Sequence, residues 1–80
     1  MGNTVLEDVK GIIARILEVS VDEIEEDTAI GDLTQWDSLH HIQIILAIEE
    51  RFNFRFTPDV MMDLEDVGDI VHAVEERVGT

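Results

Sequence analysis

The segment 39–52 has the spacing of an α-helix, but its apolar side chains cover more of the helical surface than one buried stripe requires. At about 100° per residue they span roughly 220° of the helical wheel and fall into two stripes roughly 140° apart. The first stripe contains Ile44, Ile45, Ile48 and Phe52, and the second contains Leu39, Ile42 and Leu46, with Glu49 and Glu50 beside it. One stripe can face a core. The second then faces something else, and Ser38 lies at its head.

The first helix and the loop after it are both marked in the sequence. Thr4 and Glu7 form a capping box, in which each side chain satisfies a free backbone amide. We expect this helix to end near residues 18–20. Residues 20–36 then show no sustained period, and a loop of this length inside a small domain is more often functional than idle. Its expected anchors on the core are Ile24, Ile30 and Leu33.

Two more helices follow the segment 39–52. Residues 52–56 alternate with period two, and because no second strand is available we expect an extended connector. Thr57 and Pro58 mark the start of a short helix, since proline is tolerated at the first helical position. A final helix follows Asp66 and ends at Gly79. Its apolar residues at helical spacing are Val67, Ile70, Val71, Val74 and Val78.

These segments predict an all-α fold, a four-helix bundle with three longer helices and one short third helix. A chain of 80 residues buries only about 60–65% of its unfolded surface, so we expect a single domain over residues 1–80. A hydrophobic fraction of 45% is enough for a folded domain despite the high charge.

The charge of the chain excludes several classes of partner. Nineteen acidic residues against five basic ones give a net charge of −14. This field repels nucleic acid and anionic membranes and attracts basic protein patches. The sequence shows no signal pattern and no apolar run near 18 residues, so we expect a cytoplasmic protein without membrane insertion. The second apolar stripe and the excess charge allow a monomer or a weak dimer, and we expect a monomer. The chain has no cysteine, which rules out disulfides and thiolate metal sites.

The residues around Ser38 include the residue types of a hydrolytic triad. Asp37, Ser38, His40 and His41 lie together, but one helix does not let Asp37 orient a histidine that also activates Ser38. A metal site on Asp37 and His41 lacks further ligands. We therefore expect no catalysis and no specific metal, with His40 solvated and His41 partly packed on the core.

Ser38 also suits a covalent modification. A phosphate ester on a serine in the first turn of a helix meets free backbone amides and the positive end of the helix dipole. Such a site stabilises an anionic group without needing arginine. The plain alternative is a serine that only helps to cap the helix after Asp37, which is a plausible N-cap.

A longer pattern surrounds the serine and covers roughly residues 4–78. It comprises Val21-Asp22-Glu23-Ile24, Asp27-Thr28, Leu33, Asp37-Ser38-Leu39, the helix from Ile42 to Phe52, Phe56, Pro58 and the helix from Val67 to Val78. In order and spacing this pattern resembles an acyl carrier protein. Asp-Ser-Leu alone is a weak motif, but with this helix context, length and charge it is specific.

The resemblance implies that Ser38 receives a phosphopantetheine arm from coenzyme A through a phosphopantetheinyl transferase, with Asp37 and Leu39 shaping recognition. The arm ends in a thiol that carries acyl groups as thioesters, which accounts for the absent cysteine. The helix after the serine would recognise partners, and the matching residues are Ile42, Leu46, Glu49 and Glu50. The implied partners are an acyl ligase, an acyltransferase or a ketosynthase with a basic docking patch. Family members also shelter an acyl chain, and Met61 and Met62 could line that space or simply pack.

The sequence departs from the carriers of fatty-acid synthesis, which usually have acidic side chains two and five positions after the serine. Here those positions hold His40 and Gln43, and residues 33–36 also differ from the usual pattern. We therefore expect a specialised carrier, for a modified lipid, polyketide, surface polymer or other metabolite. Two alternatives stay open. One is an aminoacyl or peptidyl carrier, and the other is an unmodified acidic domain that binds a basic partner.

Overall fold

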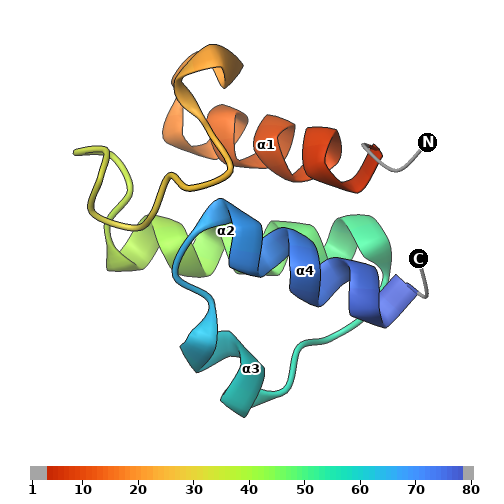
Figure 1. The fold of residues 1–80 in the computed structure, drawn as a ribbon. Coiled ribbons are helices and arrows are strands. Elements are labelled where there is room, and N and C mark those ends of the chain that lie inside the picture. The colour runs from red at the N-terminus through yellow and green to blue at the C-terminus, as the bar shows by residue number, and fades with distance from the viewer. Residues whose placement is uncertain (1–3, 79–80) are drawn as a thin grey trace.

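Four α-helices make up the fold in the computed structural model, which describes residues 4–78 (Figure 1). The helices are α1 (Thr4–Leu17), α2 (Ser38–Phe52), α3 (Pro58–Asp63) and α4 (Val67–Val78), and a 3-10 turn, η1, covers Val21–Glu23. Within residues 4–78 the only strand-like pairing is one isolated bridge. The predicted all-α fold with a short third helix is confirmed.

The three longer helices form the body of the bundle. α1 packs against both α2 and α4, while α3 lies at the bottom of the view in Figure 1. The start of α1 and the end of α4 lie at one end of the molecule. The loop between α1 and α2 lies at the other end, together with the start of α2. None of the helices within residues 4–78 has the length and apolarity that crossing a membrane requires.

Local sequence signals set the start of α3. The Thr57 side chain accepts a hydrogen bond from the Val60 N–H at 3.4 Å, and Pro58 occupies the first helical position, where its missing N–H costs nothing. This predicted boundary is confirmed. The Thr4 side chain and Gly79, which we predicted to cap α1 and to end α4, lie outside the part of the chain described here.

The two apolar stripes of α2 have different environments, as the helical wheel predicts. Ile44, Ile45 and Ile48 are buried against α1 and α4, and Phe52 is half-buried. By contrast, exposed fractions of 62%, 53% and 53% are found for Leu39, Ile42 and Leu46. The other large side chains that are almost fully buried are Trp36, Ile13, Ile24, Ile70, Val9, Val67 and Val74. One stripe of α2 therefore belongs to the core, and the other faces solvent.

The loop between α1 and α2 is held onto the start of α4. Ile24 is buried, and backbone hydrogen bonds join the loop to residues 65–68 on both sides of the Ala29–Asp66 bridge. The Gly68 N–H donates to the Glu26 carbonyl at 2.8 Å. A Cβ at Gly68 would lie 3.3 Å from that oxygen, so glycine permits this close approach. The predicted anchor Ile24 is confirmed, and the loop is an ordered part of the fold.

The two methionines of α3 differ in environment. Met61 packs against the core, whereas Met62 is 81% exposed. Met62 therefore neither lines an interior space nor packs in the bundle, so both roles predicted for it are wrong. The sequence does not show which of the two methionines faces the bundle, because α3 is too short for its apolar residues to define a buried face.

Glu49 requires a correction. The sequence places it beside the exposed stripe of α2, and we predicted that it contacts partners. Instead only 7% of it is exposed, and its carboxylate accepts a hydrogen bond from the buried Phe56 N–H at 2.7 Å. The connector after α2 folds back over this carboxylate. Glu49 therefore has a structural role, in tying the connector to the helix.

We predict that Glu49→Ala lowers the free energy of unfolding by about 1–3 kcal/mol, because the buried Phe56 N–H loses the carboxylate that accepts its hydrogen bond. Glu49→Gln should cost less, since its amide oxygen still accepts. Urea unfolding followed by circular dichroism measures the change. Glu50→Ala, at the exposed neighbouring position, is the matched control and should stay within about 0.5 kcal/mol of the parent chain. Equal losses for the two alanine variants would contradict this role.

Candidate functional site

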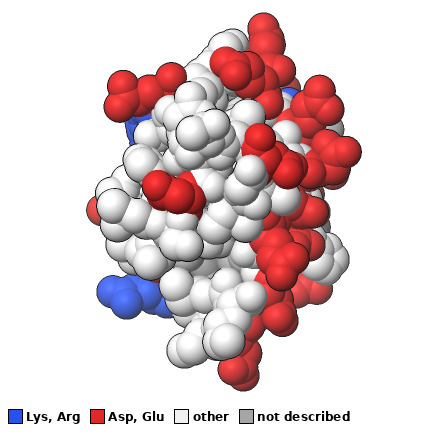
Figure 2. All heavy atoms as spheres, turned by 90° about the vertical axis from the view of Figure 1, so that its left-hand side faces the viewer, with Lys and Arg blue, Asp and Glu red and all other residues white. Residues whose placement is uncertain are grey.

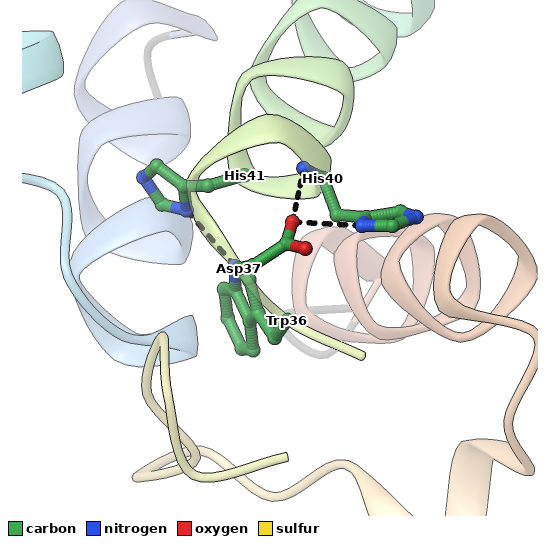
Figure 3. Close-up of polar contacts among 4 residues, drawn as sticks. All are labelled: Trp36, Asp37, His40 and His41. Atoms are coloured by element: carbon green, nitrogen blue, oxygen red, sulfur yellow. Dashed lines mark hydrogen bonds and ion pairs between the residues drawn. The ribbon is translucent and has the colours of Figure 1, made fainter. Parts of the chain in front are cut away.

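Helix α2 begins at an exposed serine. Asp37 is the N-cap, and its side-chain oxygen Oδ1 accepts the His40 N–H at 2.9 Å (Figure 3). Ser38 is the first residue of the helix, and its side chain is exposed. The N–H groups of Ser38 and Leu39 have no acceptor inside the helix, because they belong to its first turn. The predicted capping role of Asp37 is confirmed.

The Asp37 carboxylate stays ionised at this helix start. The backbone N–H of His40, followed by the His40 ring, holds the pKa of the Asp37 carboxyl below its usual value. The ring contact is short, with 2.8 Å between His40 Nδ1 and Asp37 Oδ1 (Figure 3). Both donors come from the same residue, so His40 offsets the charge that Asp37 places next to Ser38.

The residues predicted as triad types do not assemble into a triad. Asp37 pairs with His40, whereas the His41 ring extends from the other side of the helix (Figure 3). The His41 Nδ1 atom is already occupied, because it accepts a hydrogen bond from the Trp36 side chain. Within residues 4–78, no group of three or more His, Cys, Asp or Glu side chains is arranged to hold a metal ion.

Trp36 is the largest buried side chain, with an exposed fraction of 0%, and sequence reasoning missed it. Its Nε1–H donates to His41 Nδ1 at 3.0 Å, and the two rings stack with centroids 5.9 Å apart. Trp36 lies in an irregular loop, where no periodicity marks a core position. The available signal was its type, because tryptophan buries a large area and buries its N–H only with a partner.

His41 is half-buried beside this indole. Burial lowers the pKa of the His41 ring below its ordinary value, and the Leu64 backbone, which favours the protonated ring, opposes this effect only in part. The ring is therefore neutral at neutral pH, which leaves Nδ1 free to accept from Trp36. The expectation that His41 packs partly on the core is confirmed.

The exposed face of α2 carries little charge for so acidic a chain. Residues 38–48 contain no Asp, Glu, Lys or Arg, and of the two glutamates that follow only Glu50 is exposed. The face therefore presents Leu39, Ile42 and Leu46 with Ser38 at its head. Figure 2 shows the end of the molecule that carries the loop, where carboxylates crowd one side next to a broad uncharged area.

A hollow of about 570 Å³ lies where this face ends. It is lined by Leu46, Glu49, Glu50, Asn53, Phe54 and Arg55. Leu46 belongs to both the exposed stripe and the hollow, so the stripe adjoins a hollow at the C-terminal end of α2 whose other lining residues are mostly polar or charged. Of the predicted recognition residues, Ile42, Leu46 and Glu50 thus lie on one accessible surface. Glu49 is buried beneath this surface.

Known proteins share this sequence over most of its length. The phosphopantetheine attachment site family matches residues 7–74. The acyl carrier protein of Chlamydia trachomatis serovar D is 34% identical over 71 residues, which cover 89% of this chain and 92% of that protein. The acyl carrier protein of Chlamydia caviae is 33% identical over 73 residues, or 91% and 95% of the two chains. That of Phenylobacterium zucineum is 31% identical over 75 residues, or 94% and 95%.

The matched region runs from the first turn of α1 into α4, so it includes the capped start of α2 and its exposed face. Both the helical fold and the sequence similarity lead to one assignment. The chain belongs to the acyl carrier protein family and is a carrier that works through a covalently attached phosphopantetheine group.

Proposed function

We propose that Ser38 is the residue that carries the phosphopantetheine arm. The observation that supports this most directly is an exposed serine hydroxyl at the first position of α2, at the head of an exposed apolar face. A serine that served only to cap the helix would be redundant here, because Asp37 already occupies the N-cap position. Ser20, the other serine of the chain, instead uses its hydroxyl to cap η1.

The surroundings of Ser38 suit a phosphodiester. The N–H groups of Ser38 and Leu39 have no acceptor inside the helix, and the helix dipole favours negative charge at this end. The Asp37 carboxylate would repel a phosphate, but the N–H and ring of His40 both donate to it. The arm, when bound, supplies a terminal thiol that holds the acyl group as a thioester.

The Ser38 hydroxyl is the reacting group that this chain supplies in the attachment reaction. Ser38 Oγ attacks the phosphorus of coenzyme A that bears the pantetheine, and the phosphoanhydride bond breaks. Adenosine 3′,5′-bisphosphate leaves with the electron pair, while the hydroxyl proton goes to a base on the transferase. The chain is thus the substrate of the transferase and has no catalytic role of its own.

The exposed face of α2 is the proposed docking surface for partner enzymes. Leu39, Ile42 and Leu46 offer apolar contact area, and an exposed apolar patch of this kind is typical of an interaction site. The net charge of −14 steers partners that have a basic patch, which is what we infer for the transferase and for a ligase, acyltransferase or ketosynthase. A cytoplasmic location and a monomeric state stay predictions.

We further propose a specialised pathway. His40 and Gln43 replace the carboxylates that the resemblance leads one to expect on the first turns of α2, and the His40 ring is engaged with Asp37. Enzymes that bind carboxylates on the first turns of this helix would therefore bind this carrier weakly. Efficient loading and elongation by enzymes of general fatty-acid synthesis would contradict this part of the proposal.

Ser38→Ala should abolish the gain of one phosphopantetheinyl unit when the chain is incubated with coenzyme A and a broad-specificity phosphopantetheinyl transferase. Intact-mass spectrometry measures the gain, and circular dichroism checks that the exposed substitution leaves the fold unchanged. Ser20→Ala is the matched control and should be modified like the parent chain. A mass gain in Ser38→Ala, or none in the folded parent, would refute Ser38 as the attachment residue.

Ile42→Asp should raise the KM of the transferase for the carrier by about tenfold, because a charge replaces apolar contact worth roughly 1–2 kcal/mol. The free energy of unfolding should hardly change, since Ile42 is exposed. Met62→Asp makes a similar change of charge on an exposed apolar residue of α3 and should leave KM within about twofold of the parent value. Equal KM values for the two variants would argue against docking on α2.

A further inference from the structure

The side chains of Trp36 and His41 are joined across the attachment turn. The Trp36 Nε1–H donates to His41 Nδ1 at 3.0 Å, and the rings stack at an interplanar angle of 28° (Figure 3). Trp36 is the second residue before Ser38, and His41 is the third residue after it. The bond therefore closes a short segment of chain that contains Ser38.

Trp36 is in turn fixed to the loop by its backbone. Its N–H donates to the Leu33 carbonyl at 2.9 Å, and its carbonyl accepts the Gly31 N–H at the same distance. Gly31 has φ +93°, a conformation that glycine adopts without strain, which lets the loop turn back at this point. Because the indole is fully buried, the residues that lead into Ser38 are anchored from beneath.

We propose that Trp36 and His41 are positioning residues for the attachment reaction, whose hydrogen bond holds the first turn of α2 in the geometry that presents Ser38 to the transferase. This inference rests on the proposed function of Ser38. An exposed serine at a loose loop end would have to be ordered in the enzyme complex, at a cost in rate. In this protein the turn is already ordered before the transferase binds, because the hydrogen bond between Trp36 and His41 joins the loop to α2.

The bond requires a neutral His41 ring. Nδ1 accepts from the indole, so the ring proton lies on Nε2. Burial keeps the pKa of His41 low, and the causes of this shift include no charged side chain. Asp37, which precedes His41 by four residues, is engaged with His40.

Protonation would place a hydrogen on Nδ1 and break the bond to Trp36. The folded protein favours the neutral His41 ring, so the neutral ring contributes to the stability of the fold. This contribution is complete above the ordinary histidine pKa and is lost as the pH falls through the lower pKa of His41 in the folded protein. In that acidic range the hydrogen bond between Trp36 and His41 should break, and the first turn of α2 should present Ser38 less well to the transferase. A half-buried histidine that only filled space would also titrate, so the presentation of Ser38 is measured by the transfer rate and not by stability alone.

The kinetic test compares three variants with the parent chain. Trp36→Phe keeps an aromatic ring but removes the N–H donor, and His41→Leu keeps bulk but removes the acceptor. His41→Asn keeps an acceptor near the Nδ1 position without titrating. Transfer from coenzyme A is followed by intact mass at a temperature at which circular dichroism shows every variant folded. We expect kcat/KM to fall about tenfold in Trp36→Phe and His41→Leu and to stay near the parent value in His41→Asn.

The spectroscopic test uses Trp36, which is the only tryptophan in a chain that has no tyrosine. Its fluorescence should titrate with a midpoint below the ordinary histidine pKa of 6.5, and this step should be absent in His41→Asn. The ratio of parent to His41→Asn transfer rates should fall over the same pH range, since the transferase's own pH dependence cancels.

The outcomes separate the two proposals. A folded parent chain that accepts no phosphopantetheine overturns both. Modification of the parent at Ser38, with unchanged kcat/KM in Trp36→Phe and His41→Leu, overturns only the positioning role. A fluorescence step that persists in His41→Asn also overturns it, because the titrating group would then be another residue.

Discussion

Helix α2 buries one of its two apolar faces and leaves the other in water, and the remaining elements are arranged around this division. α1 and α4 cover the buried face, where each square ångström of apolar surface contributes about 25 cal/mol. The exposed face gains nothing from folding, so its Leu39, Ile42 and Leu46 indicate a surface that partners cover. Ser38 lies at the start of α2, next to the acidic loop. The same helix thereby supplies part of the core, the proposed docking surface and the proposed attachment point.

An accessible attachment residue has to be combined with a defined geometry. The structure achieves this by burying the residue two positions earlier: Trp36 lies in the core, while Ser38 is exposed. The bridge between Ala29 and Asp66 fixes the middle of the loop to α4 in the same way. A loop without helical periodicity is thus fixed to the rest of the fold, although its surface carries many of the chain's carboxylates.

Most of the fold could be predicted because it follows from local chemistry. The 3.6-residue period gives the helices, and Asp37 and Thr57 mark two of their starts by the hydrogen bonds their side chains accept. The environments of Trp36 and Glu49 could not be predicted, since both depend on distant or irregular backbone. The acceptor role of Glu49 exists only because the connector brings the Phe56 N–H back over α2. Burial of Trp36 likewise depends on how the irregular loop before α2 folds onto the core, which no short pattern encodes.

The acidic field, the apolar face and the capped helix start all support one use of this chain, as a carrier whose arm is on Ser38. The most direct evidence would come from fragmenting the peptide that contains residues 36–41 after the transferase reaction, and locating the added mass by tandem mass spectrometry. We predict that the phosphopantetheinyl unit is found on Ser38, in nearly all molecules. A unit on any other residue, or an unmodified peptide from the folded protein, would contradict the assignment of the site.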